Sequence, residues 1–287
     1  MGSPTWRFVF ATLVGFAPEI AVASDQASPS SMASSTVLPD WIVTVGIEGR
    51  ILPAWPGASE SKPGLTALPL FGVRKAGTPP SFSNPRDSFS FSVIELGTFK
   101  LGPAIALIGR RNAQNYKELY GLANVGYAAQ IGGFAEYWPV PWLRLRAEVR
   151  QGIGGETGVT GNGFMDAVLP LGQWTFSAGP RVTAQSTASV SPYFSISQAQ
   201  SAATAVVAST TGLAPLPAYA ASGGLYSYGA GTQVLYRFNP QWEARTFVEY
   251  ERLTGSAADS PLVTQRGCAN QLTYGLGAYS FDMHPWW

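Results

Sequence analysis

Thiol and imidazole side chains are almost absent from this chain of 287 residues, which holds one cysteine, Cys268, and one histidine, His284. A single cysteine excludes an intramolecular disulfide and a metal cluster built on several thiolates. The lone histidine lies beside Pro285 near the end of the sequence, so a Ser-His-Asp triad would need that end folded into a site. We therefore expect no metal site, no cofactor and no triad.

Charge is also scarce. Asp, Glu, Lys and Arg make up 12% of the chain, against about 25% in soluble domains. The formal net charge is +1, and no cluster of Lys and Arg marks a nucleic-acid surface. Although 46% of the residues are hydrophobic, no run of about 18 apolar residues for a spanning helix follows the N-terminal region.

Glycine (32 residues) and aromatic residues (13%) are abundant instead. A β-barrel satisfies its backbone between strands and needs only about 10 alternating residues for each membrane crossing. It therefore spreads its apolar residues thinly along the sequence. This composition favours a barrel.

The N-terminus has the features of an export signal. Arg7 precedes an apolar stretch over residues 8–17, and Ala21-Val22-Ala23 forms a small-residue cleavage site. We predict a cleaved signal peptide over residues 1–23 and a flexible Ser- and Ala-rich leader over residues 24–40. The barrel is then expected over residues 41–281, with a C-terminal tail over residues 282–287.

The strongest strand pattern lies at residues 143–150, where apolar and charged residues alternate with a period of two. A strand sends the leucine, alanine and valine side chains to one face. In a barrel that face meets lipid. Arg144, Arg146, Glu148 and Arg150 would then point into the lumen.

Neighbouring segments supply matching strands. Residues 123–137 alternate in the same way and place Glu136 on the polar face, with a hairpin expected at residues 139–141. An apolar stripe from Tyr226 to Phe238 is followed by a turn and a strand from Trp242, with Glu243, Arg245, Glu249 and Glu251 facing inward. The residues predicted to line the lumen are Glu136, Arg144, Arg146, Glu148, Arg150, Arg245 and Glu249.

Further strands are predicted to start near Trp41, Leu65, Ser88, Phe99, Phe164, Trp174, Val190 and Leu272. The fold class is therefore all-β, a single antiparallel transmembrane β-barrel of about 12 strands. Residues 198–222 and 254–267 are expected to be loops. Aromatic residues near strand ends form the expected interfacial girdles, with a buried aromatic core as the alternative: Trp41, Trp138, Trp142, Trp174, Trp242 and Tyr279.

Several segments resemble one family. The segment at residues 191–202 resembles a Tyr-Phe-Gly-Val-Ser segment with the Gln-Ala/Ser stretch that follows it, and residues 255–263 are similar to a Gly-Asp-Ala-Ala-Asp-Ser-Pro-Ile-Val loop. Residues 143–152 and 179–181 also look like strands of that family. It is the MltA-interacting protein (MipA/OmpV) family of Gram-negative outer-membrane proteins, and the resemblance runs from about Trp41 to Phe281.

This resemblance implies an outer-membrane protein that scaffolds a lytic transglycosylase and a bifunctional murein synthase. The expected partners are outer-membrane lipid and these two murein enzymes, and we expect no enzymatic activity. Asp259, Ser260 and Pro261 form a turn that is a candidate partner-binding loop. Two alternatives stay open: a narrow pore or small-solute channel, and a soluble exported ligand-binding barrel.

Inward carboxylates could also suggest a glycosidase pair, which needs two such groups about 5–10 Å apart. Ion pairing in the lumen is the better interpretation, because neighbouring arginines keep carboxylates ionised whereas a catalytic acid needs a raised pKa. The glycines at residues 152–155 lack the strand-to-helix context of a phosphate loop and indicate a turn.

Overall fold

The computed structural model describes residues 41–66, 72–75 and 82–281, and the predicted signal peptide, leader and tail lie outside these residues. Thirteen strands in the described part form one sheet, in the order β2-β1-β13-β12-β11-β10-β9-β8-β7-β6-β4, with β3 beside β1 and β5 beside β6. The strands are β1 (Trp41–Pro53), β2 (Ser61–Thr66), β3 (Gly72–Lys75), β4 (Phe89–Ser90), β5 (Ile94–Leu96), β6 (Phe99–Ile108), β7 (Ala128–Val140), β8 (Leu143–Gly154), β9 (Val159–Leu171), β10 (Trp174–Gln185), β11 (Gly224–Arg237), β12 (Trp242–Leu253) and β13 (Asn270–Phe281).

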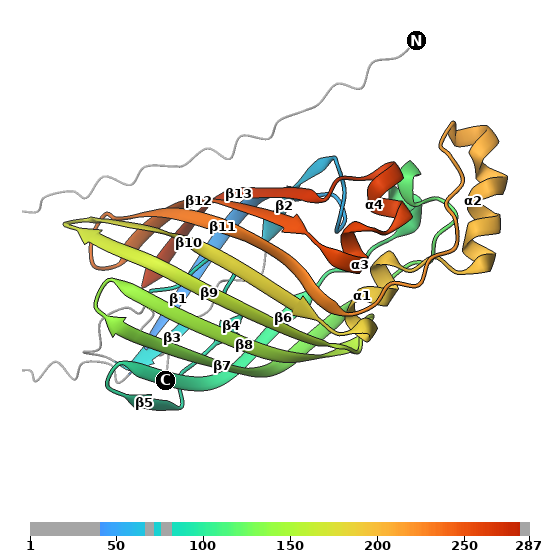
Figure 1. Cartoon of the computed structure of the whole chain (residues 1–287). Helices are drawn as coiled ribbons and strands as arrows, with labels where there is room; N and C mark the ends of the chain where they lie inside the picture. The colour runs from blue at the N-terminus through green and yellow to red at the C-terminus, as the bar shows by residue number, and fades with distance from the viewer. Residues whose placement is uncertain (1–40, 67–71, 76–81, 282–287) are drawn as a thin grey trace, which may run out of the picture. The chain divides into compact units, whose positions relative to one another are not determined.

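The described pairs are antiparallel, and the first long strand, β1, pairs with the last, β13. Figure 1 shows the sheet curving round an interior. The expected hairpin between β7 and β8 is present, with Val140 opposite Leu143 across a turn at Pro141 and Trp142. The prediction of one antiparallel barrel of about twelve strands is confirmed.

Side chains alternate along the strands between an apolar exterior and a polar interior. In β8, Val149 is 61% exposed, whereas Arg144 on the opposite face is fully buried. Ile131 of β7 and Leu276 of β13 also point outward. An apolar exterior around a charged interior is the arrangement of a barrel in lipid, since a soluble protein rarely exposes so much contiguous apolar surface. No helix among the described residues is long and apolar enough to cross a membrane.

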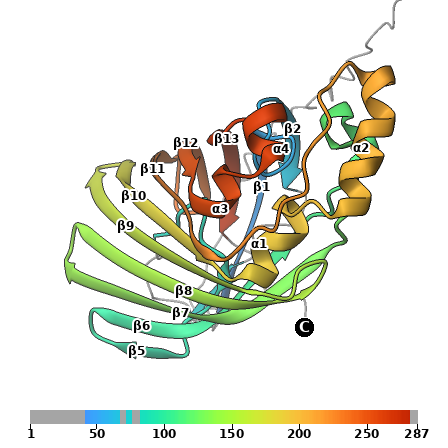
Figure 2. The ribbon, with the colours of Figure 1, turned by 45° about the vertical axis from the view of Figure 1, so that its right-hand side comes forward.

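The two ends of the barrel differ. Short turns join β7 to β8, β9 to β10 and β11 to β12 at one end, and long connections join β6 to β7, β10 to β11 and β12 to β13 at the other. The long connections carry the helices η1 (Ala113–Asn115), η2 (Lys117–Leu119), α1 (Thr187–Phe194), α2 (Gln198–Thr211), α3 (Gly255–Ala258) and α4 (Pro261–Arg266). Figures 1 and 2 show α1 to α4 gathered at this end, with α2 farthest from the strands.

These connections pack into a cap. One cluster includes Trp55, Leu119 and Leu216, and a second includes Val190 and Phe194; most of these side chains are almost completely buried. Burial of apolar side chains stabilises such packing by roughly 1.5–3 kcal/mol each. The long loops therefore form a small hydrophobic core outside the sheet.

Two loop predictions were wrong in secondary structure. Residues 198–222 contain α2, which Ser197 and Gln200 begin with reciprocal side-chain-to-backbone hydrogen bonds and Gly212 ends at φ 68°. Residues 254–267 contain α3 and α4. The strand predicted to start near Val190 was also wrong, because Val190 lies within α1 and packs in the cap.

Some aromatic predictions are corrected as well. Trp142, Trp174 and Trp242 are exposed near the short turns, as a girdle requires. Tyr279, in contrast, is buried and donates to Glu48 at 3.0 Å. Trp138 points inward too, because it follows Glu136 by two residues on the same strand face and donates to its carboxylate at 2.8 Å.

The apolar stripe predicted from Tyr226 starts two residues later, at Tyr228. A register irregularity between Thr183 and Ala184 of β10 interrupts the alternation opposite Tyr226. Tyr226 therefore leaves the exterior face and packs edge-on against Phe194 of the cap, with 5.9 Å between ring centroids.

Candidate functional site

The interior faces of β7 and β8 form a ladder of alternating charges. Glu136 lies opposite Arg146 and binds Arg144 at 2.8 Å and Arg146 at 3.3 Å. Glu148 binds Arg146 at 2.8 Å and also contacts Arg150. Because β8 carries these residues at every second position, the strand pleat aligns them on one face.

Two further interior groups continue this network. Asp166 of β9 binds Arg144 at 3.1 Å and Arg181 of β10 at 2.7 Å. On the other side of the barrel, Glu48 of β1 binds Arg245 of β12 at 2.6 Å and also contacts Arg50. Arginines and carboxylates thus neutralise one another around the wall, which buried charges require.

Glu249 of β12 differs from the other interior carboxylates. Its ion pair with Arg181 is long, at 3.7 Å, and neither carboxylate oxygen has a hydrogen-bond partner among the described residues. Gly231 lies opposite it in the ladder, and a Cβ there would lie 2.1 Å from one carboxylate oxygen. The glycine therefore leaves the space that this carboxylate occupies.

The lumen also contains a segment of the chain itself, residues 82–88, which lies between β3 and β4 in sequence. We call residues 82–88 the inner segment; β4 follows it and joins the sheet beside β6. It begins with a turn in which the backbone N–H of Asp87 donates to the carbonyl of Asn84 at 3.0 Å. The Asn84 side chain accepts from Arg86 N at 3.1 Å, as Asn commonly does in turns.

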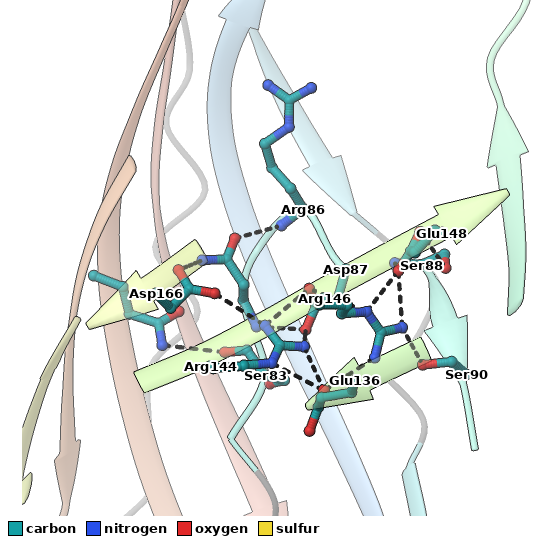
Figure 3. Close-up of polar contacts among 12 residues, drawn as sticks. Ser83, Arg86, Asp87, Ser88, Ser90, Glu136, Arg144, Arg146, Glu148 and Asp166 are labelled. Atoms are coloured by element: carbon teal, nitrogen blue, oxygen red, sulfur yellow. Dashed lines mark hydrogen bonds and ion pairs between the residues drawn. The ribbon is translucent and has the colours of Figure 1, made fainter. Parts of the chain in front are cut away.

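Charged residues of the inner segment bind opposite walls of the barrel. Arg86 makes two parallel hydrogen bonds to Glu251 of β12, at 3.0 and 3.2 Å. Asp87 binds Arg144 of β8 at 2.6 Å and lies 3.7 Å from Arg146. Figure 3 shows Asp87 between these two arginines. Bidentate arginine pairs are among the stronger and more directional hydrogen bonds.

Neutral groups of the inner segment complete these contacts. Asn84 donates to Asp166 at 3.2 Å, and Ser88 donates through its hydroxyl to Glu148 at 2.8 Å. The carbonyl of Ser83 accepts from Gln233 of β11 at 3.1 Å, and that of Pro85 accepts from Arg50 at 3.2 Å. The inner segment thus touches β1, β8, β9, β11 and β12, and it occupies the lumen.

Every residue predicted to line the lumen lies on the interior face. Glu136, Arg144, Arg146, Glu148, Arg150, Arg245 and Glu249 are all buried. Arg144 and Glu148 expose 0% and 1% of their surface. They line a filled interior.

Sequence reasoning missed the partners that complete this network. Glu48 and Asp166 each sit within an alternating apolar strand, which is the signal that could have revealed them. Arg86 and Asp87 look like ordinary turn residues after Asn84-Pro85, and only their charge in a chain so poor in charge hinted at a buried role. Arg181 follows a glycine and a proline, which masked the strand pattern.

The candidate partner loop belongs to the cap. Ser260 is fully buried and donates to the Phe194 carbonyl at 2.8 Å. Pro261 begins α4 and is buried, whereas Asp259 is the C-cap of α3 and is exposed. The serine and proline therefore hold the cap together and are not presented at the surface.

Two buried arginines also hold the cap. Arg111 donates to the carbonyls of Tyr193 and Pro192, and Arg266 donates to those of Glu118 and Ala214. Burial lowers the pKa of Arg111 to about 10. These contacts satisfy carbonyl groups that packing would otherwise leave without partners.

No group of acidic, histidine or cysteine side chains in the described part of the chain could hold a metal ion. The interior carboxylates are engaged with arginines, so they have the arrangement of structural ion pairs. Glu249 is the least engaged, but Arg181 lies beside it.

In a comparison with solved structures, the chain matched outer-membrane proteins. The chain is similar to the NanC porin, with 8% identity over 85% of this chain and all (100%) of that one and a TM-score of 0.36. It is similar to an outer membrane channel from Pseudomonas putida F1, with 9% identity over 89% of this chain and 100% of that chain and a TM-score of 0.40. OmpT of Vibrio cholerae matches with 9% identity over 85% and 97% of the two chains and a TM-score of 0.33.

No curated protein matched the chain in a sequence comparison. A protein family did match: the one described as MltA-interacting protein MipA, over residues 45–281. The match covers almost the whole described barrel and its cap. This chain is an outer-membrane β-barrel and belongs to the MltA-interacting protein MipA family.

Proposed function

We propose that this barrel is an outer-membrane scaffold that links a lytic transglycosylase and a murein synthase to the membrane. The family assignment supports this proposal, since the family is described by its interaction with MltA. The single structural observation that carries it is the filled lumen, where Arg144 and Asp166 are inaccessible to water. While the inner segment occupies the lumen, the rims are the surfaces with which the barrel can act on a partner protein.

The two rims offer different surfaces. In bacterial outer-membrane barrels the short turns face the periplasm and the long loops face outward. By this rule the turns at Pro141, Gln173 and Asn239 face the periplasm, where murein lies, and the cap faces outward. The described barrel also begins and ends at the short-turn end, because Thr44 pairs with Phe281.

This orientation separates the two rims as candidates for partner binding. Asp259, Ser260 and Pro261 lie in the cap, at the end opposite the short turns. We therefore assign murein-enzyme binding to the short-turn rim and not to this loop.

Site-specific photo-crosslinking in intact cells tests the assignment. A photoreactive residue would replace Gln173 or Asn239 on the short-turn rim, and Ala205 of α2, which is exposed on the cap, would serve as the matched control. We expect murein hydrolase and synthase among the proteins captured from the rim positions and none from Ala205. Capture of neither enzyme at any rim position, or equal capture from the cap, would refute the proposal.

A further inference from the structure

The inner segment is held in the lumen mainly by polar contacts. Its turn residues Asn84, Arg86 and Asp87 all bind charged groups on the wall. Phe82 is the aromatic exception, and it packs edge-on against Trp138 with 6.3 Å between ring centroids. The contacts that hold the turn in place are therefore ion pairs and hydrogen bonds, and substitutions at Arg86 and Asp87 remove both of its close ion pairs.

At Arg144 and Glu148 the wall keeps ion pairs of its own without the inner segment, whereas Glu251 loses Arg86 and keeps a hydrogen bond from the Ser227 hydroxyl. Arg144 keeps Glu136 and Asp166 as partners without Asp87. Glu148 keeps Arg146 and Arg150 without Ser88. A wall whose charged side chains largely remain paired can stay folded around an empty, hydrated interior. Paired buried charges are tolerated where unpaired ones are not.

The cap also leaves space at the outer end. An open depression of about 770 Å³ lies between α1 and the connection before β7, and its lining includes Asn124, Gly126, Gly155 and Ser191. Its lining mixes polar and apolar residues and carries no charged side chain. Solutes at this end therefore meet a hollow beside the β8–β9 loop.

We propose that the protein is a closed ion channel in which the inner segment is the plug, and that the Arg86–Glu251 and Asp87–Arg144 ion pairs hold it closed. Displacement of residues 82–88 opens a path lined by Arg50, Arg146, Glu148, Asp166 and Glu251. This activity goes beyond scaffolding, and it uses the lumen, whereas the scaffold uses the short-turn rim.

Planar-bilayer recording of the purified full chain tests the proposal. The key variant is Arg86→Gln with Asp87→Asn, which keeps a polar side chain at both positions and removes both charges. The Asp87–Arg144 pair is buried, whereas the side chains of Arg86 and Glu251 are 26% and 19% exposed. Losing one partner of such pairs is unfavourable, so we expect the open probability to rise on the order of a hundredfold. The matched control is Glu95→Gln with Lys100→Gln, which neutralises a pair 4.0 Å apart between β5 and β6 in which Glu95 is 59% exposed.

A charge exchange provides a stricter test. Arg86→Glu alone should open the channel, and Arg86→Glu combined with Glu251→Arg should close it again, because the pair is restored in reverse. Heat-modifiable migration on gels establishes that each variant is folded. Should these variants fail to fold, Ser88→Ala, which removes one hydroxyl hydrogen bond to Glu148, should still raise the open probability by about tenfold.

Two results would overturn the proposal. Folded variants that remain as silent as the wild type would show that the inner segment is not what closes the lumen. An equal rise in the Glu95 and Lys100 control would show that conductance follows general destabilisation. The photo-crosslinking experiment at the short-turn rim tests the scaffold proposal separately, and its result does not depend on either of these outcomes.

Discussion

Replacing Arg144 tests the energetics of the lumen most sharply. This guanidinium is fully buried and pairs with Asp87, Glu136 and Asp166 at 2.6, 2.8 and 3.1 Å. Arg144→Met keeps much of the side-chain volume but leaves these carboxylates with one cation fewer. Breaking a buried pair from one side costs about 3–5 kcal/mol. Because Glu136 keeps its ion pair with Arg146, we expect Arg144→Met to lower the free energy of unfolding by an amount at the lower end of this range, about 3 kcal/mol.

The assay is guanidinium unfolding of the barrel in lipid vesicles, followed by tryptophan fluorescence. Arg252→Met is the matched control, since Arg252 is exposed and makes a hydrogen bond to Asn270 at 2.8 Å. The control should change the free energy of unfolding by less than about 1 kcal/mol. Adding Asp87→Asn to Arg144→Met should cost less than the sum of the single changes, because the two residues interact. A loss below about 1 kcal/mol for Arg144→Met would refute the buried ionic network.

Other expectations concern the wall, the loops and the cap. Gly132→Ala would place a Cβ 1.9 Å from a carbonyl oxygen of the next strand and should destabilise the barrel by about 1–3 kcal/mol in unfolding titrations, whereas Gly49→Ala meets nothing within 4 Å and should be nearly neutral. Burial raises the pKa of the Glu156 carboxyl above 4.5, so folding favours its protonated form. Glu156→Gln should therefore be more stable than the wild type at pH 8. This difference in stability should vanish as the pH falls through the folded-state pKa and below 4.5. Ser260→Ala removes a 2.8 Å hydrogen bond to the Phe194 carbonyl and should cost about 1–3 kcal/mol, with faster amide exchange in α3 and α4 and unchanged exchange in the strands.

Each of these expectations has a clear contrary result. Equal effects of alanine at the two glycines would contradict the close strand approach at Gly132. A stability difference for Glu156→Gln that grows toward acid pH would contradict the sign of the shift. Faster exchange spread over the strands in Ser260→Ala would show that the cap and the barrel unfold together.

The sequence predicted the wall of the barrel well, because lipid outside and ion pairs inside impose opposite chemistries on alternate residues. The charged face of β8 and its partner Glu136 followed directly from that alternation. The rule fails where the backbone departs from a regular strand. The irregularity opposite Tyr226 moved that ring from the exterior to the cap.

The cap and the inner segment could not be predicted in the same way. The helix α2 consists of Gln, Ala, Ser, Thr and Val and carries no charge, so it has no amphipathic stripe, and its capping residues resemble those of a turn. The inner segment forms its structure through contacts with distant strands, such as Arg86 with Glu251. Local sequence contains no information about such pairs. Charges in a charge-poor chain were the only available hint.

The claim that the lumen is filled can be tested most directly by liposome swelling with the wild-type protein and a small sugar such as arabinose. A filled interior predicts swelling no faster than that of empty liposomes, while an open porin incorporated in parallel swells rapidly. Swelling of the wild-type liposomes at a rate that falls with increasing solute size would contradict it, because only a continuous water-filled pore sorts solutes in that way.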